Sequence, residues 1–565
     1  AGGVPAQIME GGGFALSPGG DRIAFSRGRD LMELPLAEGA EPRRLARVRG
    51  GASGLTWSPD GSDLAFVSNR GDHSFVGVYD GDRAEVRYVA PSVHHDGNPV
   101  WSPDGRRIAF LRIPNERVVH MFAPRREALP FSIHVVDAAG MTSTEVWKAD
   151  PGVGSAFSGV NASSQLFWGE GDRIVFPWEG TGWKHLYSVP VTGGRAMDLT
   201  PGAAEVQFAS LAPDGRSMIY DSNDGDIDRK HVWLAHVAGG QREIVTPGDG
   251  LEWGAVVTGA GTVAFHAGSV NEPSHTEVLV DGDRNWVSPE LPSSFPKDRL
   301  VTPEQLVFTA ADGMQIHGQL FLPPDHEPGQ QHPAMLFFHG GSRRQMLLGF
   351  HHRGYYHNAY AFNQVLASAG YVVLAVNYRS GVGYGMEFRE AENYGATGAS
   401  EFADVMGAGL YLKGRSDVDP DRIGLWGGSY GGYLTALGLA RASDLFAAGV
   451  DLHGVHDWNV VINGFRPSYE PEDYPEFSRV AYESSPMAFM DGWRSPVLLI
   501  HGDDDRNVPF SETVDVAEAL AKRGVDFEQL IFPDEVHGFL LHKNWLAAYE
   551  ASLDFLGRKL RRPIS

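Results

Sequence analysis

The chain contains no cysteine, and this absence excludes several kinds of site. Without thiols there can be no disulfide, no zinc–thiolate centre and no cysteine nucleophile. No apolar run approaches the ~18 residues that a membrane-spanning helix needs, so we predict a soluble protein without membrane partners. Lack of cysteine does not decide between a cytoplasmic and a periplasmic or secreted location, and both stay open.

Positive charge is also scarce, because 47 Lys and Arg face 71 Asp and Glu, for a net charge of −24. This balance argues against nucleic acid as a partner, since phosphate binding needs a basic surface. The first residues lack the basic and apolar segments of a signal peptide, although a mature chain could have lost one. A length of 565 residues predicts two or more domains. The oligomeric state is open, with a homo-oligomer as one alternative.

The first half of the chain repeats itself. Residues 16–25, 57–66 and 101–110 share a turn of the Ser-Pro-Asp-Gly type followed by an apolar strand, with weaker copies at 168–176, 212–220 and 259–265. Proline and glycine fix such a hairpin turn. The aromatic ends of the copies are 41, 44, 66, 44 and 45 residues apart. This period predicts a β-propeller of six or seven blades that acts as a scaffold or lid, in which the long gap holds an insertion or a degraded blade.

The second half has a different pattern and predicts an α/β-hydrolase fold. A proline-containing linker at 289–296 separates the halves, so we expect a propeller over 1–295 and a catalytic domain over 296–565. Apolar runs alternate with helical segments and predict a doubly wound, mostly parallel sheet. The runs are 334–338, 371–376, 423–425, 447–452, 497–500 and 529–532, and the helices are 361–369, 399–412, 511–523 and 544–556.

One stretch of this half has the pattern of a nucleophile elbow. An apolar strand leads into Gly427-Gly428-Ser429-Tyr430-Gly431, and a helix-forming stretch follows. The pattern G-x-S-x-G places a serine on a sharp turn, where side chains at 427 and 431 would collide with neighbouring backbone. In a chain with 70 glycines the pattern arises by chance on the order of half a time, so its partners must decide.

The partners follow in the order that this fold requires, which is Ser, Asp, His. Strand 497–500 ends in a loop with Asp503, Asp504 and Asp505, and strand 529–532 precedes His537. Strand 334–338 ends in His-Gly-Gly, a loop that contributes a backbone N–H to an oxyanion hole together with that of Tyr430. These pieces predict a catalytic triad, but spacing alone does not choose among the three aspartates.

No metal or cofactor is predicted. His94 and His95 adjoin Asp96, but neighbouring side chains do not converge on one ion without further ligands, so we interpret them as loop residues. The three aspartates could suggest calcium, but no further oxygen ligands stand at the required spacing. His501 and His339 are interpreted as structural.

The chain resembles the prolyl oligopeptidase family of serine peptidases over nearly its whole length. The resemblance rests on Gly427–Tyr433, on His501-Gly502-x-x-Asp505-x-x-Val508-Pro509 and on His537-Gly538, and Tyr378–Gly385 is also similar. It implies that Ser429 is the nucleophile, His537 the base and Asp505 its orienting carboxylate. The oxyanion would be held by the N–H groups of Tyr430 and Gly341, and the propeller would admit only short peptides.

The resemblance also implies a substrate pocket. Its dipeptidyl-peptidase branch has an apolar S1 wall that matches Val455, Trp458, Val461 and Phe465, completed by Tyr430, Asn507 and Val508. The alternative is that Trp458 and its neighbours have only a packing role within the domain. That branch's paired glutamates are not visible in residues 1–295, so we expect an oligopeptidase or acylaminoacyl-peptidase that prefers an apolar P1 residue.

Three alternatives stay open at this point. Arg343 and Arg344 follow the oxyanion loop, and one of them could bind a substrate carboxylate in a carboxypeptidase-like exopeptidase, or form a salt bridge to the acidic propeller. The same triad could serve a carboxylesterase. Lastly, the chain could be a non-catalytic propeller adaptor, which the intact Ser429, Asp505 and His537 disfavour.

Overall fold

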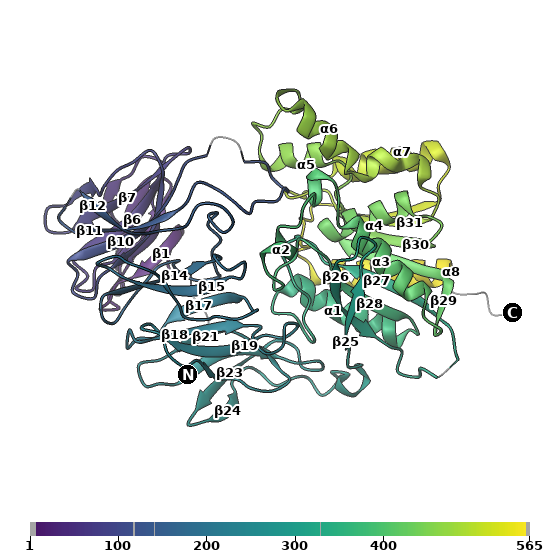
Figure 1. Cartoon of the computed structure of the whole chain (residues 1–565), viewed down its shortest axis with the longest axis horizontal. Coiled ribbons are helices and arrows are strands. Elements are labelled where there is room, and N and C mark those ends of the chain that lie inside the picture. Colours follow the sequence, from purple (N-terminus) through teal and green to yellow (C-terminus); the bar gives the residue numbers. More distant parts are fainter. Residues whose placement is uncertain (1–6, 117–118, 141, 328, 561–565) are drawn as a thin grey trace.

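The computed structural model describes residues 7–116, 119–140, 142–327 and 329–560. Figure 1 shows two parts side by side. The first half of the chain, in purple to blue, forms a set of antiparallel sheets. The second half, in green to yellow, forms one sheet covered by helices. In the described residues, no helix is both long and apolar enough to cross a membrane.

The first half forms six units of four strands each, as a propeller requires. Strands β7 and β9 are bridged once, between Ser74 and His95, so the second and third units form one continuous sheet. The units are β1 (Gly12–Leu16), β2 (Arg22–Arg27), β3 (Asp30–Pro35) and β4 (Arg43–Arg47); β5 (Ser53–Trp57), β6 (Asp63–Asn69), β7 (Ser74–Asp80) and β8 (Glu85–Tyr88); β9 (His95–Trp101), β10 (Arg107–Ile113), β11 (Ser132–Asp137) and β12 (Ser143–Lys148); β13 (Phe167–Gly169), β14 (Arg173–Trp178), β15 (His185–Pro190) and β16 (Met197–Asp198); β17 (Val206–Leu211), β18 (Ser217–Ser222), β19 (His231–His236) and β20 (Glu243–Ile244); and β21 (Leu251–Val257), β22 (Val263–Gly268), β23 (His275–Val280) and β24 (Asp283–Trp286).

The repeated motif explains both the turns and the packing of neighbouring units. In the second unit the Ser58 hydroxyl donates to Asp60 at 2.6 Å and accepts from the N–H of Asp63 at 2.9 Å, while Gly61 takes a φ of 72°. The indole N–H of Trp57 then donates to the carbonyl of Ala15 in the unit before it, at 3.0 Å. This motif therefore closes its own hairpin and ties its unit to the previous one, and the indole N–H of Trp101 makes the same kind of link to the carbonyl of Thr56.

The long gap in the repeat holds insertions and no further blade within the described residues. One insertion, residues 114–131, lies between β10 and β11, and another, residues 149–166, lies between β12 and β13. Six units are therefore present in the described chain. The first insertion reaches the catalytic domain, where the Arg466 side chain donates to the carbonyl of Val119 at 3.1 Å.

The second half has one eight-stranded sheet, in the order β25-β26-β28-β27-β29-β30-β31-β32. The pairs β25–β26 and β26–β28 are antiparallel and all other pairs are parallel, which confirms the predicted mostly parallel sheet. The strands are β25 (Glu304–Thr309), β26 (Gln315–Phe321), β27 (His332–Phe338), β28 (Val372–Asn377), β29 (Val418–Gly428), β30 (Ala448–Leu452), β31 (Val497–Gly502) and β32 (Phe527–Phe532).

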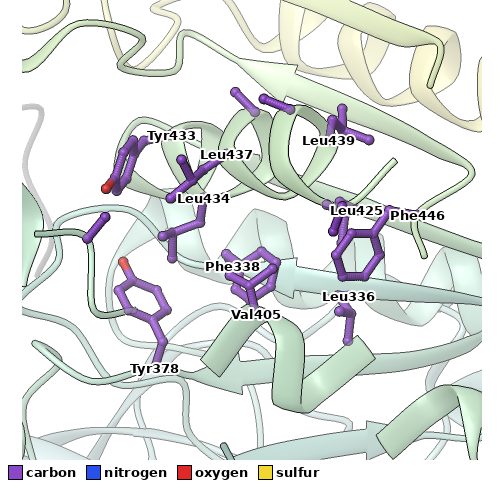
Figure 2. Close-up of a cluster of buried hydrophobic side chains, with 14 of the residues drawn as sticks. Leu336, Phe338, Tyr378, Val405, Leu425, Tyr433, Leu434, Leu437, Leu439 and Phe446 are labelled. Carbon is purple, nitrogen blue, oxygen red and sulfur yellow. The ribbon is translucent and has the colours of Figure 1, made fainter. Parts of the chain in front are cut away.

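Helices cover both faces of this sheet. Side chains of α1 and α8 pack on one face, and those of α3, α4 and α7 pack on the other. Figure 2 shows the second cluster, in which Leu425, Leu437 and Phe446 are fully buried. The helices are α1 (Gly354–Ser368), α2 (Met386–Arg389), α3 (Phe402–Lys413), α4 (Tyr430–Arg441), α5 (Trp458–Phe465), α6 (Pro475–Glu483), α7 (Ser511–Arg523) and α8 (His542–Leu560), with short 3-10 turns η1 (Lys297–Arg299), η2 (Gly395–Thr397), η3 (Pro471–Asp473) and η4 (Pro486–Gly492).

The predicted domain boundary at 295/296 falls between the two sheets. β24 ends at Trp286 and β25 begins at Glu304. Phe295 and Leu300 already pack against the cluster of α1 and α8. We keep the boundary at 295/296 as a proposal.

Candidate active site

Ser429 lies at a sharp turn between β29 and α4. Its φ of 60° is positive, a costly conformation for a non-glycine residue that is typical of a nucleophile elbow. A Cβ on Gly431 would lie 2.0 Å from the carbonyl oxygen of Phe338, and one on Gly427 would lie 2.6 Å from the backbone of Gly431. The glycines are therefore required by close backbone contacts, as the sequence predicts.

The structure brings Asp505 and His537 together at neighbouring strand ends. Nδ1 of His537 lies 2.6 Å from Oδ2 of Asp505, and the other carboxylate oxygen accepts the N–H groups of Asn507 and Val508 at 2.8 and 3.0 Å. Burial alone would raise the pKa of Asp505, but hydrogen bonds from His501 and His537 outweigh it and hold the pKa well below its usual range. Asp505 is therefore an anion that fixes the orientation of the imidazole.

The other two aspartates of this loop have different partners. Asp503 accepts the backbone N–H of Asp534 at 2.7 Å. Asp504 forms an exposed ion pair with Arg506 at 2.7 Å. Of the three aspartates, Asp505 is thus the one that contacts His537 in the described chain.

Ser429, His537 and the two oxyanion candidates, Gly341 and Tyr430, line one cavity of about 390 Å³. Tyr430 begins α4, so its N–H lies at a helix N-terminus, where developing negative charge is favoured. Gly341 belongs to the loop after β27. That loop is held by the Tyr378 hydroxyl, which donates to the carbonyl of His339 at 2.7 Å.

His339 and His501 both have structural contacts, in line with their interpretation. The His339 ring is buried and stacks on Tyr378 at 4.3 Å, and burial lowers the pKa of His339 to about 3. His501 donates through Nε2 to Asp505 at 3.1 Å, while its Nδ1 contacts Thr513 at 2.7 Å. His501 is thus a second histidine on the triad carboxylate.

Sequence reasoning missed His453, which follows β30. Its Nε2 lies 2.9 Å from the Tyr355 hydroxyl, and its ring centroid lies 4.4 Å from that of His537. Burial, followed by the charges of His537 and His501, holds the pKa of His453 well below its usual range, so His453 is neutral beside His537. The one feature of the sequence that could have identified His453 is its position directly after a strand. With Asp505 and His537 it forms the single grouping with metal-ligand spacing in the described chain, and the triad accounts for two of its three members.

The predicted S1 residues all line the same cavity as Ser429. They are Val455, Trp458, Val461, Phe465, Asn507 and Val508. Three of them lie on α5, whose first turn is capped by Asp457 through the N–H of Asn459. Trp458 is fully buried and its ring packs on Tyr430 at 5.4 Å. Trp458 therefore both packs the domain and forms the apolar end of the cavity.

The propeller also contributes a residue to this cavity. Phe122, from the insertion between β10 and β11, lies 4.7 Å from the Trp458 ring and 6.0 Å from the Phe465 ring. Its carbonyl accepts the N–H of Ala396 at 3.1 Å. The long gap in the repeat was the signal for such an arm, but its sequence did not indicate where it would reach.

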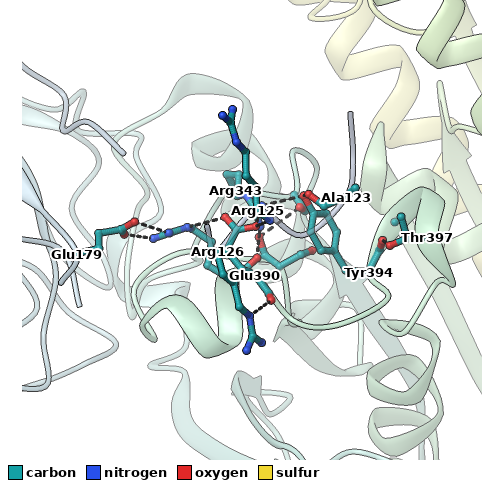
Figure 3. A network of polar contacts seen from close by, with 12 residues as sticks. Ala123, Arg125, Arg126, Glu179, Arg343, Glu390, Tyr394 and Thr397 are labelled. Atoms are coloured by element: carbon teal, nitrogen blue, oxygen red, sulfur yellow. Dashed lines mark hydrogen bonds and ion pairs between the residues drawn. The ribbon is translucent and has the colours of Figure 1, made fainter. Parts of the chain in front are cut away.

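The two arginines after the oxyanion loop have different surroundings. Arg343 donates to Glu390 and to the Tyr394 hydroxyl, each at 2.8 Å, so its guanidinium is already engaged (Figure 3). Its carboxylate partner thus belongs to the catalytic domain and not, as one alternative held, to the propeller. Arg344 has no carboxylate partner among the described residues and lines the active-site cavity.

The same network joins the domains beside the cavity, as Figure 3 shows. Glu390 accepts the N–H of Arg125 at 2.9 Å, and its carbonyl accepts from the Arg126 side chain at 2.8 Å. Arg389 forms a buried pair with Glu179 of the propeller, 2.7 Å at one of its contacts. The bonds of Glu390 hold the arm that carries Phe122, and the Arg389 pair joins a second propeller segment to α2.

The fold and the geometry of this site together define the structural class of the protein. A serine on a strand–helix elbow, followed in the chain by an aspartate and a histidine at later strand ends of a mostly parallel sheet, is the arrangement of an α/β-hydrolase. More particularly, the catalytic part of the chain belongs to the prolyl oligopeptidase family of serine peptidases. A model of the "Prolyl oligopeptidase family" matches residues 358–562, and one of the "Dipeptidyl peptidase IV (DPP IV) N-terminal region" matches residues 154–266.

Individual relatives agree with this assignment. Dipeptidyl peptidase 8 of Homo sapiens is 32% identical over 44% of this chain, but the match spans only 27% of that protein. Dipeptidyl-peptidase 5 of Porphyromonas gingivalis is 24% identical over 97% of this chain and 94% of its own length. A solved puromycin-hydrolyzing peptidase of Mycobacterium tuberculosis has a TM-score of 0.77 and 20% identity, covering 96% of this chain and 85% of that one, which is a likeness of fold.

Proposed function

We propose that the protein hydrolyses short peptides at apolar P1 residues through an acyl-enzyme. One observation carries this proposal: Ser429, His537, the oxyanion candidates and an apolar wall share one cavity that the propeller arm borders with Phe122. A peptide carbonyl at Ser429 would place its P1 side chain against Trp458. Because the arm belongs to the propeller, a folded protein would have to displace the propeller to enter.

In this mechanism Ser429 Oγ attacks the carbonyl carbon while His537 takes the hydroxyl proton. The N–H groups of Tyr430 and Gly341 hold the oxyanion of the tetrahedral intermediate. His537 then passes its proton to the leaving amine, and the C–N bond breaks. Water attacks the acyl-enzyme by the same route and releases the acyl half. Asp505 stabilises the imidazolium throughout and stays ionised.

A dipeptidyl mode is not favoured. No Asp or Glu is among the described residues lining the cavity, so nothing there would pair with a free N-terminal ammonium. Glu179 is buried and paired with Arg389. Glu205 is buried and accepts the N–H groups of Gly383 and Gly385.

A peptide panel tests the proposal. Fluorogenic peptides of four residues with Leu or Phe at P1 are offered with free and acylated N-termini, beside an unfolded and a folded protein. We expect cleavage after Leu and Phe whether or not the N-terminus is blocked, little action on the folded protein, and a loss of roughly four to six orders of magnitude for Ser429→Ala. Hydrolysis of aryl esters without any peptide cleavage would instead indicate an esterase.

A further inference from the structure

Two arginines line the active-site cavity without a carboxylate partner among the described residues. Arg344 donates through Nη1 to the carbonyl of Arg343 at 2.6 Å, but its buried Nε has no hydrogen-bond partner. Arg353 is the N-cap residue of α1, and its side chain forms no ion pair within the described chain. Arg344 is thus a partly buried cation beside the nucleophile with no carboxylate partner in the described chain, and Arg353 adds a second, exposed cation.

A second cavity, of about 70 Å³, extends this cationic region. It shares Arg344 and Arg353 with the first and is also lined by Lys230 of the propeller. Lys230 is buried, and its ammonium donates to Gln207 at 2.6 Å. No Asp or Glu is among the described residues lining this second cavity. Basic side chains therefore line the path from the nucleophile towards the domain interface, although burial lowers the pKa of Lys230 and Asp221 lies close enough to act on it.

Both arginines come from the segment between β27 and α1, which also carries the oxyanion candidate Gly341. The Arg344 guanidinium lies 6.0 Å from the ring of Tyr356, whose neighbour Tyr355 contacts His453. His453 in turn packs against His537, which delivers the proton to the leaving amine. The apolar residues that suit the P1 side chain belong to a different element, α5.

We infer that Arg344 and Arg353 bind the C-terminal carboxylate of the substrate, so that the protein removes one or two residues from the C-terminus of short peptides. This inference rests on the proposed peptidase function and adds that cleavage takes place near the C-terminus of the peptide. Guanidinium groups pair with carboxylates through two parallel hydrogen bonds, and partial burial strengthens such a pair. One residue spans at most ~3.6 Å, so only a short leaving group keeps its carboxylate near Arg344.

The test compares matched peptides that differ only at the C-terminus. N-acylated peptides with Leu at P1 and one or two following residues are offered as free acid and as amide. We expect the wild-type protein to prefer the acid at least tenfold in kcat/KM. Arg344→Met and Arg353→Met should each raise KM for the acid by roughly 10- to 100-fold, because each removes a charged hydrogen-bonded contact. KM for the amide should stay nearly unchanged in both variants. Arg344→Lys should restore part of the preference.

Arg479→Met is the matched control, because Arg479 is an exposed arginine paired with Glu483 on α6. Equal losses for acid and amide, or a wild-type protein without preference, would overturn the inference. A change in KM that appears only with peptides carrying an acidic residue in the acyl half would also overturn the inference. Should no peptide be cleaved, the proposed function fails, and the site is tested separately by inhibition of ester turnover. There, Leu-Ala as free acid must inhibit more strongly than Leu-Ala amide, and Arg344→Met must remove the difference.

Discussion

The ring of Phe122 lies 4.7 Å from the ring of Trp458, although one belongs to the propeller and the other to the catalytic domain. Trp458 is buried against Tyr430 and Tyr433, at 5.4 and 5.0 Å, and is held by its own domain. Phe122 depends on the arm between β10 and β11. The apolar end of the cavity is therefore assembled from both halves of the chain.

This relationship predicts the effect of Phe122→Ala. Removing the ring takes apolar contact area from the substrate but leaves the triad intact, so KM for peptides with Leu or Phe at P1 should rise about tenfold, while kcat changes little. Steady-state kinetics on both peptides measure this. Phe14→Ala is the control, because Phe14 is a highly exposed propeller residue. An unchanged KM for both peptides would remove Phe122 from the substrate site.

Asp505→Asn should reduce kcat by about 10⁴-fold, because an amide no longer holds the imidazole in the required tautomer. Asp504→Asn, one residue earlier, should leave kcat unchanged, since its carboxylate pairs with Arg506 on the surface. Burst kinetics with an activated ester would show whether acylation is the step that slows. Similar losses in both variants would contradict the assignment of Asp505.

The same substitution should alter the pH dependence of stability. The pKa of Asp505 is lowered in the folded protein, so its ionised form contributes stability above the unfolded pKa of about 3.9, and this contribution is lost as pH falls through the folded value. Asp505→Asn should therefore lower Tm at pH 7 and approach the wild type in strong acid. Thermal denaturation between pH 2 and pH 8 measures the difference, and a constant gap would contradict it.

His134 of the propeller predicts a second pH effect. Its ring is buried, stacks on Phe110 at 5.3 Å, and contacts the hydroxyls of Ser132 and Ser143 at 2.9 and 3.1 Å. Burial, then the charge of Arg112, lowers the pKa of His134 to about 4. Below pH ~6.5 the unfolded chain binds a proton that the folded chain does not, so stability falls as pH drops from 6.5 to 4.

His134→Gln removes this proton uptake, and its unfolding free energy should fall less steeply over that range than the wild type's. The difference should reach at most about 3 kcal/mol, from 1.36 kcal/mol per pH unit. Glu145, whose carboxylate lies 3.9 Å from the ring, would reduce it if the pair charges together. Denaturant titrations at several pH values provide the measurement, and parallel curves for the two proteins would refute the expectation.

Gly431→Ala should abolish activity, because its Cβ would lie 2.0 Å from the carbonyl oxygen of Phe338 and displace the elbow. Gly557→Ala in α8 is the matched control. Nothing lies within 4 Å of a Cβ there, and alanine in a helix interior should stabilise the protein by about 0.5–1 kcal/mol. Activity and Tm together separate the two sites. A fully active Gly431→Ala would show that the elbow tolerates a side chain.

Much of this architecture follows from local sequence patterns. Turns such as Ser58–Gly61 depend on hydrogen bonds between near neighbours, so each repeat predicts its own hairpin. The elbow and its partners could be predicted because strand ends of a parallel sheet meet at one edge. The predicted helix 361–369 begins later than α1, which starts at Gly354. The first turn of α1 carries Tyr355 and Tyr356, which line the active-site cavity, so no regular apolar stripe marks it in the sequence.

Contacts between distant segments could not be predicted from patterns. Nothing in the sequence around Phe122 indicates that it lies on Trp458, and nothing distinguishes Arg343, which is engaged by Glu390, from Arg344, which is not. His453 was missed because its contacts with Tyr355 and His537 join three segments far apart in the chain. Such placements depend on how loops pack after the sheet has formed.

The arm that carries Phe122 lies in a different part of the sequence from the residues of the proposed catalytic triad. Under the proposed function, a change in the loop between β10 and β11 would alter which side chains are accepted without touching any residue of the catalytic sheet. Loops of this kind tolerate insertion and substitution more readily than strand ends that hold a triad. Under the proposed function, substrate choice and hydrolysis would thus be set by separate parts of the chain, so that one changes while the other is retained.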